Sequence, residues 1–207
     1  VPFFTENIFN YKFFFGFNNI FSGNILIGEG ESQIDVTSLT PSEKLAKAGI
    51  AYILQDKSIF PGMTVEENLW MGGFLKNQAA ESKAAAERVF DKYPQLAARR
   101  RHQAKVLSGG ERRLLEISRA LVMNPDVLLV DEPSIGLEPK FIDMVFEILN
   151  DLQHNEGKTI IMVEQNAKKG LEFADIGYVM VSGKIAIAGK GSDLLDNPKV
   201  GELFLGG

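Results

Sequence analysis

The sequence predicts an α/β protein with a mostly parallel sheet and an inserted group of helices. Three short apolar runs have the length and composition of strands buried on both faces, which is typical of a parallel sheet covered by helices. They are Ile50–Ile53, Val127–Val130 and Thr159–Val163. Longer stretches with helical composition or period lie between them and predict the helices.

The first elements are short. We expect a strand from Asn24 to Ile27, followed by a turn at 28–30. Thr40 opens the next helix, because Pro41 suits its first position and Glu43 completes a capping box. That helix ends at Gly49, directly before the buried strand 50–53.

Residues from Thr64 to about Ala104 are expected to form helices. Thr64 is followed three residues later by Glu67, a second capping box, and 79–93 is rich in strong helix formers. Trp70 and its apolar neighbours are either the core of this helical part or a surface for a partner. The basic run 99–101 is expected to be a solvated face rather than a nucleic-acid patch.

A small-residue turn at 107–111 is the first chemical feature. Ser108 and Glu111 form a third capping box, and Gly109 and Gly110 leave the backbone open to close approach. Bare N–H groups at a helix start attract anions such as phosphate. An ordinary helix cap would explain this turn equally well if it stood alone.

The second feature is the strand 127–130 followed by Asp131 and Glu132. Carboxylates at the C-terminal edge of a buried strand lie where α/β folds place ligands. One of the two can hold Mg²⁺ while the other polarises an attacking water. A plain acidic turn is the alternative for this segment taken alone.

The remaining elements follow in order. A helix is expected from Pro139 to about His154, and then comes the strand 159–163. The segments 176–181 and 184–188 alternate around Ser182 and Gly183, which predicts a hairpin with a two-residue turn. A short helix is expected at 191–195.

Composition excludes several classes of function. The 207 residues contain no cysteine, which rules out disulfides and thiolate metal sites, and the formal net charge of −5 argues against a broad nucleic-acid footprint. The apolar runs are too short to span a bilayer, and the first residues lack a secretory n-region. We therefore expect a cytoplasmic protein that reaches a membrane only through a partner.

With the spacing between them, the two chemical features resemble the signature motif and Walker B motif of ABC-type ATPases, which are P-loop NTPases. Leu107-Ser-Gly-Gly-Glu111, Ser134-Ile-Gly-Leu-Glu-Pro139 and Val163-Glu-Gln-Asn166 are most similar to the ATP-binding subunits of importers for branched-chain amino acids and related amides. The segment 60–69 also matches the family. The resemblance covers roughly Phe15 to the end.

The resemblance implies a division into parts. Residues 22–63 and 119–207 would form the ATPase core, and 64–118 the helical subdomain that carries the signature motif. Residues 1–21 are atypical, since they hold eight of the fifteen phenylalanines. The family's P-loop lysine should fall near Asn7, yet no Gly-Lys-Ser pattern is present, so the N-terminal strands and P-loop are expected to be incomplete.

The resemblance also implies cofactors and residue roles. ATP and Mg²⁺ would be the cofactors. Asp131 and Gln55 would bind the metal, and Glu132 and Gln165 would be catalytic, with Gln165 standing where most of the family has histidine. Nucleotide binding would involve Gln55 and the turn residues Ser108, Gly109, Gly110 and Glu111, the turn acting on the nucleotide of a second subunit.

The implied partners are a homo- or heterodimeric ATPase partner and membrane-embedded permease subunits, with no nucleic acid. The protein would sit on the cytoplasmic face of the cell membrane, and hydrolysis would drive import of a solute that the sequence does not reveal. One alternative is a truncated or degenerate subunit of the same fold that does not bind nucleotide. Another is a non-transport ABC ATPase acting on nucleic acid, against which the short helical part and absent cysteines count.

Overall fold

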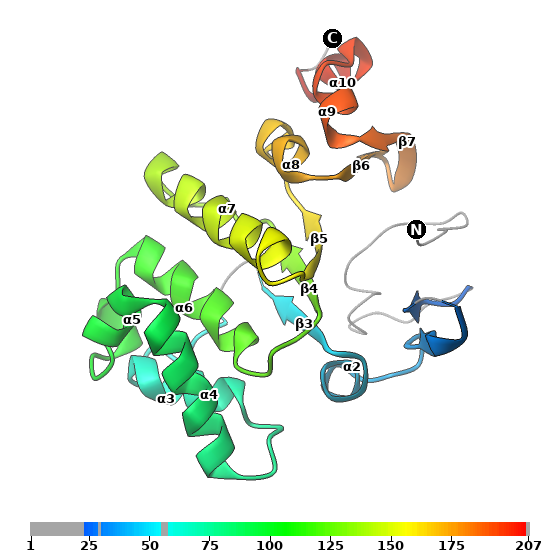
Figure 1. Ribbon diagram of the computed structural model, residues 1–207. Helices are drawn as coiled ribbons and strands as arrows, with labels where there is room; N and C mark the ends of the chain where they lie inside the picture. The colour runs from blue at the N-terminus through cyan, green and yellow to red at the C-terminus, as the bar shows by residue number, and fades with distance from the viewer. Residues whose placement is uncertain (1–22, 29, 55–57, 206–207) are drawn as a thin grey trace.

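A computed structural model (Figure 1) describes residues 23–28, 30–54 and 58–205 of the chain. The predicted features of residues 1–21 and Gln55 lie outside this part. The helices and strands of the described part are, in chain order, β1 (Leu26–Ile27), the 3-10 helix η1 (Gly30–Ser32), β2 (Ile34–Asp35), α2 (Pro41–Ala48), β3 (Ile50–Ile53), α3 (Val65–Gly72), α4 (Ala79–Lys92), α5 (Pro94–Ala98), the 3-10 helix η2 (Ala104–Val106), α6 (Gly109–Leu121), β4 (Val127–Asp131), α7 (Pro139–His154), β5 (Thr159–Val163), α8 (Ala167–Phe173), β6 (Ile176–Val181), β7 (Lys184–Lys190), α9 (Gly191–Leu195) and α10 (Pro198–Leu205).

The three apolar runs form one parallel sheet, as predicted, in the order β3-β4-β5. Ile50 pairs with Val127, and Val127 pairs with Thr159 on its other side. Because the strands are parallel, their carboxyl ends meet at one edge of the sheet. The residues directly after the strands therefore share this edge, and they include Glu132 and Glu164.

Strands β3 and β4 are covered on both faces, as their apolar sequences predict. Strand β5 differs from the prediction, because it lies at the edge of the described three-stranded sheet and is only partly buried. On one face, Ile117 of α6 and the apolar side of α7 pack against residues such as Leu128 and Val130. On the other face, Ile50 and Leu129 pack against Val36 and against partly buried residues that include Ile27 of β1 and Ala48 of α2. The sheet is thus the middle of three layers (Figure 1).

Helices α3 to α6 form a second apolar core beside the sheet. Leu69 of α3, Leu96 of α5 and Leu114 of α6 are fully or almost fully buried in it. Helix α6 belongs to both cores, since Leu114 and Leu115 pack with α3 and α4 whereas Ile117 packs on the sheet. The proposed division of the chain after residue 118 stays a prediction and would fall inside this helix.

The local patterns at helix starts and turns are confirmed. Thr40, Thr64 and Ser108 each form a complete capping box with the glutamate three residues later. Gly49 ends α2 with a φ of 61°, a left-handed conformation that glycine adopts without strain. The β6–β7 hairpin turns at Ser182 and Gly183, both with positive φ, as a type I′ turn requires.

The basic run differs from expectation. Arg99 donates to Glu111, and Arg100 donates to both Glu66 and Glu87, so two of the three guanidinium groups are held by carboxylates. These ion pairs tie the turn after α5 to α3, α4 and α6. The run is therefore a structural junction as well as a face that stays partly exposed to solvent.

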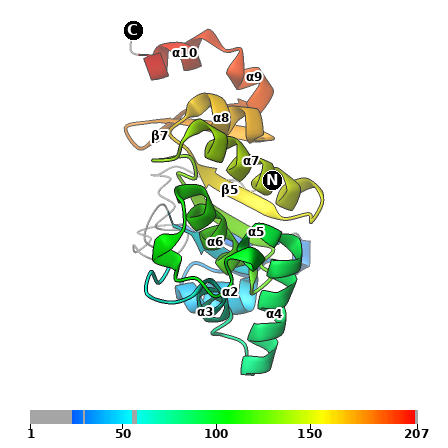
Figure 2. The same ribbon diagram turned by 90° about the vertical axis from the view of Figure 1, so that its left-hand side faces the viewer.

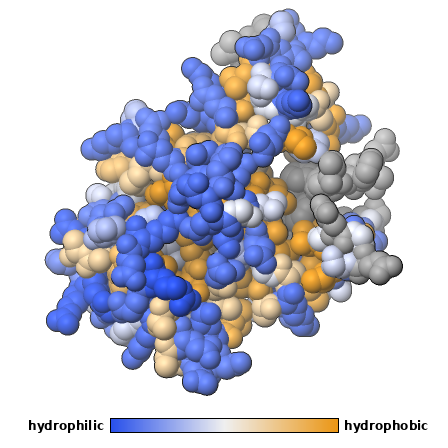
Figure 3. Space-filling model, in the orientation of Figure 1, coloured by the Kyte–Doolittle hydropathy of each residue, from blue (hydrophilic) through white to orange (hydrophobic). Residues whose placement is uncertain are grey.

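The molecule is elongated, with α3 and α4 at one end and α10 at the other (Figure 2). Apolar surface is visible near the centre and right of one face (Figure 3). Exposed apolar side chains on the two antiparallel strand pairs include Leu26, Ile34, Ile176, Tyr178 and Ile185. Within the described ranges, every helix is too short or too polar to cross a membrane.

Candidate functional site

Asp131 is the last residue of β4 and is almost completely buried, with 5% of its surface exposed. The hydroxyl of Tyr52, on the neighbouring strand β3, donates to its carboxylate at 3.1 Å. The backbone carbonyl of Asp131 accepts a hydrogen bond from Arg113 at 3.4 Å. The Tyr52 hydroxyl orients the carboxylate and the Arg113 bond holds the backbone that carries it, and a fixed orientation is what a metal ligand requires.

Glu132 has a left-handed backbone, with a φ of 42°. Such a conformation is uncommon for residues other than glycine, asparagine and aspartate, and it costs of order 1–3 kcal/mol. A hydrogen bond from its N–H to the carbonyl of Val163 on β5, at 2.8 Å, helps to hold it. Strain of this kind clusters at functional sites, so the observation supports a functional role for this glutamate.

Arg113 of α6 joins the helix to the ends of two strands. Its guanidinium donates to the carbonyl of Leu54 after β3 at 2.7 Å and to the carbonyl of Asp131, and it forms an ion pair with Glu116 at 2.9 Å. Both charged side chains are about 95% buried. The pair therefore sets the position of the residue directly before Gln55, although Gln55 itself lies outside the described residues.

A second carboxylate, Glu164, joins the loop after β4 to the loop after β5. It accepts the hydroxyl of Ser134 at 2.7 Å and the N–H of Ser134 at 3.2 Å. It also accepts the N–H of Asn166 at 2.8 Å. Gln165, the predicted catalytic amide, is exposed between Glu164 and Asn166, at the same sheet edge as Glu132.

The start of α6 is the other predicted group. The Ser108 hydroxyl accepts the N–H of Glu111, and the Glu111 carboxylate accepts the N–H of Ser108 and a hydrogen bond from Arg99. The bond from the Ser108 N–H, together with Arg99, lowers the pKa of Glu111. Glu111 is thus used to shape the helix start, and the exposed Ser108 contributes its hydroxyl to the same cap.

The two glycines of this turn differ in their surroundings. A Cβ on Gly109 would meet only Leu137, at 3.9 Å, so this exposed backbone is open to close approach. A Cβ on Gly110 would lie 2.1 Å from the ring of Phe141 on α7. Packing against α7 therefore requires glycine at 110, a reason that the sequence interpretation did not include.

The oxygen donors fit Mg²⁺ better than a transition metal. In the described part of the chain there is no group of three or more His, Cys, Asp or Glu side chains that could hold a metal ion. Mg²⁺ usually takes only one or two carboxylates and fills its other positions with water and substrate phosphates. A single buried carboxylate such as Asp131 matches that pattern.

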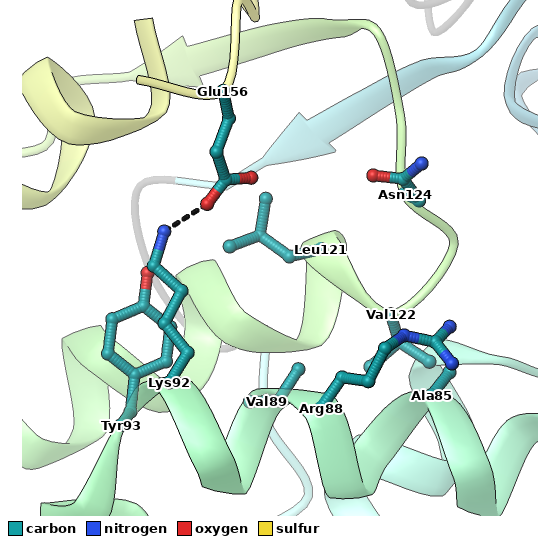
Figure 4. Close-up of a pocket in the computed structure, with 9 residues that line it drawn as sticks. All are labelled: Ala85, Arg88, Val89, Lys92, Tyr93, Leu121, Val122, Asn124 and Glu156. Carbon is teal, nitrogen blue, oxygen red and sulfur yellow. Dashed lines mark hydrogen bonds and ion pairs between the residues drawn. The ribbon is translucent and has the colours of Figure 1, made fainter. Parts of the chain in front are cut away.

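A cavity of about 310 Å³ lies elsewhere, between α4, the end of α6 and the segment after α7 (Figure 4). Valine, leucine and alanine side chains line part of it, and Lys92 reaches across to Glu156 at its rim. None of the predicted site residues lines this cavity. It is a space between the helical part and the sheet layer, not the nucleotide site.

Comparison with known proteins identifies the family. A family model described as "ABC transporter" matches residues 17–135, more than half of the chain. The chain is also 40% identical, over 179 residues, to the high-affinity branched-chain amino acid transport ATP-binding protein BraG of Pseudomonas aeruginosa, covering 86% of this chain and 74% of BraG. The chain belongs to the ABC transporter family. It is accordingly an ABC-type ATPase subunit of a transporter.

Other ABC proteins agree. The probable branched-chain amino acid transport ATP-binding protein LivF of Archaeoglobus fulgidus is 37% identical over 94% of this chain and 80% of its own length. The lipopolysaccharide export ATP-binding protein LptB of Escherichia coli is 29% identical over 89% of this chain and 75% of its own length. The subunit is thus most like the branched-chain amino acid group, with an export ATPase among its relatives.

Solved structures confirm the predicted fold class. The ADP conformation of MJ1267, an ATP-binding cassette of an ABC transporter, superposes with a TM-score of 0.79 at 28% identity and covers 95% of this chain and 82% of that one. A dimeric post-hydrolysis state of the cassette MJ0796, bound to ADP and Pi, has a TM-score of 0.70 at 21% identity, with coverage of 86% and 78%. The latter shows the shared fold alone.

Four residues of the site were given no role from the sequence: Tyr52, Arg113, Ser134 and Glu164. Each acts through a partner at least 18 positions away, so no local pattern reveals it. Glu164 was part of a quoted motif, and its place directly after a buried strand was the one available signal. Arg113 and Glu116 are spaced i,i+3 on a helix, a spacing that is compatible with an ion pair but does not indicate its burial.

Proposed function

We propose that this subunit hydrolyses ATP to drive the import of branched-chain amino acids or related small solutes. The observation that carries the proposal is the 40% identity to BraG over 74% of that protein. Import as opposed to export, and the solute class, rest on this similarity and on the greater identity to BraG and LivF than to LptB.

In this proposal, each residue at the sheet edge has a separate role in ATP hydrolysis. Asp131, with Gln55, would hold Mg²⁺, which supplies charge neutralisation to the phosphates. Glu132 accepts a proton from the attacking water as general base, and Gln165 orients that water or the terminal phosphate through its amide. The positive φ of Glu132 supports this assignment, because the side chain is oriented differently from that of an extended residue. Backbone strain of this kind is also typical of functional sites.

Ser108 and Gly109 would serve the nucleotide of a second subunit. Both residues are exposed at the start of α6, where an anion can reach the hydroxyl of Ser108 and the backbone N–H of Gly109. Two copies, or this chain and a similar one, would close around two nucleotides. This closure would change the conformation of permease subunits in the membrane. The MJ0796 cassette, which shares this fold, is a dimer in its post-hydrolysis state with ADP and Pi.

Hydrolysis is tested with Glu132→Gln, which keeps the shape and removes the basic carboxylate. We expect the loss of steady-state turnover to be at least about 100-fold, in the range of removing a general base, while ATP binding is retained. Glu147→Gln, an exposed glutamate on α7, is the matched control and should be unaffected. Unchanged hydrolysis by Glu132→Gln would contradict the assigned role.

The solute is tested in vesicles that contain this subunit together with its permease subunits. ATP supplied on the subunit's side should drive accumulation of labelled leucine, isoleucine or valine on that same side, and Glu132→Gln should abolish it. ATP-dependent movement of lipid in the opposite direction, without amino-acid uptake, would favour the export branch. Hydrolysis without transport of any of the three amino acids would exclude branched-chain amino acids as the solute.

One observation favours a second candidate, a subunit of the same fold that does not bind nucleotide. Residues 1–21 contain no Gly-x-x-x-x-Gly-Lys-[Ser/Thr] pattern, and a P-loop supplies most direct phosphate contacts in this class. Calorimetric titration of the 207-residue chain with ATP and Mg²⁺ separates the candidates. Micromolar binding would rule out the second, and no binding up to millimolar ATP would support it.

A further inference from the structure

We infer that Glu164 is a positioning residue for hydrolysis, which holds the Gln165 loop against the Glu132 loop. This inference rests on the proposed function of those two residues. Glu164 does not touch the reacting atoms in this scheme. It acts by joining two loops, each of which carries one of the proposed catalytic side chains.

The contacts continue the β4–β5 ladder beyond the strands. Asp131 pairs with Val163 in the sheet, and the Glu132 N–H then donates to the Val163 carbonyl. At the next step the chain has left the sheet, and the Glu164 carboxylate accepts the N–H of Ser134 where a backbone carbonyl would otherwise be needed. The Glu164 side chain therefore continues the β4–β5 pairing beyond the strands. It links the loop that carries Glu132 to the loop that carries Gln165.

The chemistry of a carboxylate suits the position of Glu164 between the two loops. Its two oxygens accept three hydrogen bonds, two from Ser134 and one from Asn166, and each is an N–H or O–H donor. A carboxylate only accepts, whereas an amide would turn one donating NH₂ toward a donor. Charge-assisted bonds of this kind are also roughly twice as strong as neutral ones.

The surroundings leave room for this side chain. A Cβ on Gly170 of α8 would lie 3.3 Å from the Glu164 Cβ, so glycine there lets α8 pack directly on the stem of the glutamate. Ser134 is nine-tenths buried, and Asn166 caps α8 by accepting the N–H of Lys169. The link that the Glu164 carboxylate makes is thus held at both ends, by the buried Ser134 and by Asn166 at the start of α8.

The test compares Glu164→Gln, Glu164→Ala and Ser134→Ala with Glu172→Ala, a control on α8 whose glutamate is exposed. Removing the bridge should lower kcat for ATP hydrolysis by about 10-fold, as for supporting residues around metal sites, with the KM for ATP changed little. Ser134→Ala should not slow Glu164→Ala further, because both remove the same link. Amide hydrogen exchange at Ser134 and Asn166 should accelerate in Glu164→Ala and not in Glu172→Ala.

Each result has a defined meaning. If Glu132→Gln abolishes turnover while both Glu164 variants keep wild-type kcat, the positioning role is overturned and the proposed function stands. If kcat falls only in proportion to a loss of folded protein, measured by urea unfolding, Glu164 is merely structural and the inference is wrong. If wild-type and Glu132→Gln turn over equally, the proposed function fails, and this role fails with it.

Discussion

At the scale of single residues, the lack of a side chain at two adjacent glycines shapes the start of α6. Gly110 is buried against Phe141, and the Cβ of any other residue would overlap the ring. Gly109, one position earlier, has open space around it. Two adjacent glycines of one motif are therefore required for different reasons, one for packing and the other for access.

This difference predicts a difference in stability. Gly110→Ala should lower the free energy of unfolding by about 1–3 kcal/mol, the usual cost of overpacking, whereas Gly109→Ala should leave it nearly unchanged. Urea unfolding measures both. Adding Phe141→Leu to Gly110→Ala should recover part of the loss. Equal stability of the two alanine variants would contradict the packing explanation.

Glu43 gives a prediction for pH. The hydrogen bond from Lys47, together with the N–H and hydroxyl of Thr40, lowers the pKa of Glu43 to about 2 from an ordinary value of 4.5. Since the folded-state pKa is depressed, the contribution of ionised Glu43 to the stability of the fold is complete above pH 4.5. It is lost as the pH falls toward 2.

Wild type should therefore melt at a higher temperature than Glu43→Gln at about pH 6, and the difference should shrink steadily between pH 4.5 and about 2. Calorimetry over this range measures it. A Tm difference that stays constant with pH would show that Glu43 acts through shape alone.

At the scale of elements, the contacts between the helical part and the sheet layer include helix α6, Ile148 of α7 and the ion pairs of one lysine. Lys92, near the end of α4, forms ion pairs with Asp151 and Glu156 at and after the end of α7, beside the cavity of Figure 4. The side chains are 30–40% exposed, so the pairs are partly screened by water.

A double-mutant cycle with Lys92→Met and Asp151→Asn should give a coupling free energy of about 0.5–1 kcal/mol, at the upper end for accessible pairs. The coupling should fall in about 1 M salt, because screening acts on accessible charges. Urea unfolding provides all four stabilities. A coupling that is absent at low salt would mean that these ion pairs do not help to join the two parts.

Elements were the scale at which the sequence was most informative. Helix starts at Thr40, Thr64 and Ser108 are fixed by contacts three residues apart, and the hairpin turn by two residues that adopt positive φ, so local patterns suffice. The bridges made by Tyr52, Arg113 and Glu164 cross between elements, and only the fold brings their partners together. Gln55 and the N-terminal segment remain predictions, since both lie outside the described residues.

At the scale of the whole molecule, the proposed site is shared between two copies. Ser108 stands at the start of α6, while Asp131 and Glu132 stand at the edge of the sheet. If each nucleotide takes the serine from one subunit and the carboxylates from the other, a symmetric dimer holds two composite sites.

Mixing two inactive variants tests this arrangement. Ser108→Arg and Glu132→Gln should each abolish hydrolysis alone. A randomly exchanged equal mixture should recover about a quarter of wild-type turnover if sites act independently, because half of the dimers are mixed and each has one intact site. No recovery, with exchange verified by labelled subunits, would place both residues at the nucleotide of the same subunit.

The left-handed backbone of Glu132 bears on the history of this chain. A lineage that had given up hydrolysis would be free to place asparagine or glycine at 132, since either tolerates that conformation better than glutamate. Drift would then relax the turn and make the protein more robust. The presence of glutamate in this unfavourable conformation is therefore what we expect of a chain that uses the carboxylate, and it counts against the alternative without hydrolysis.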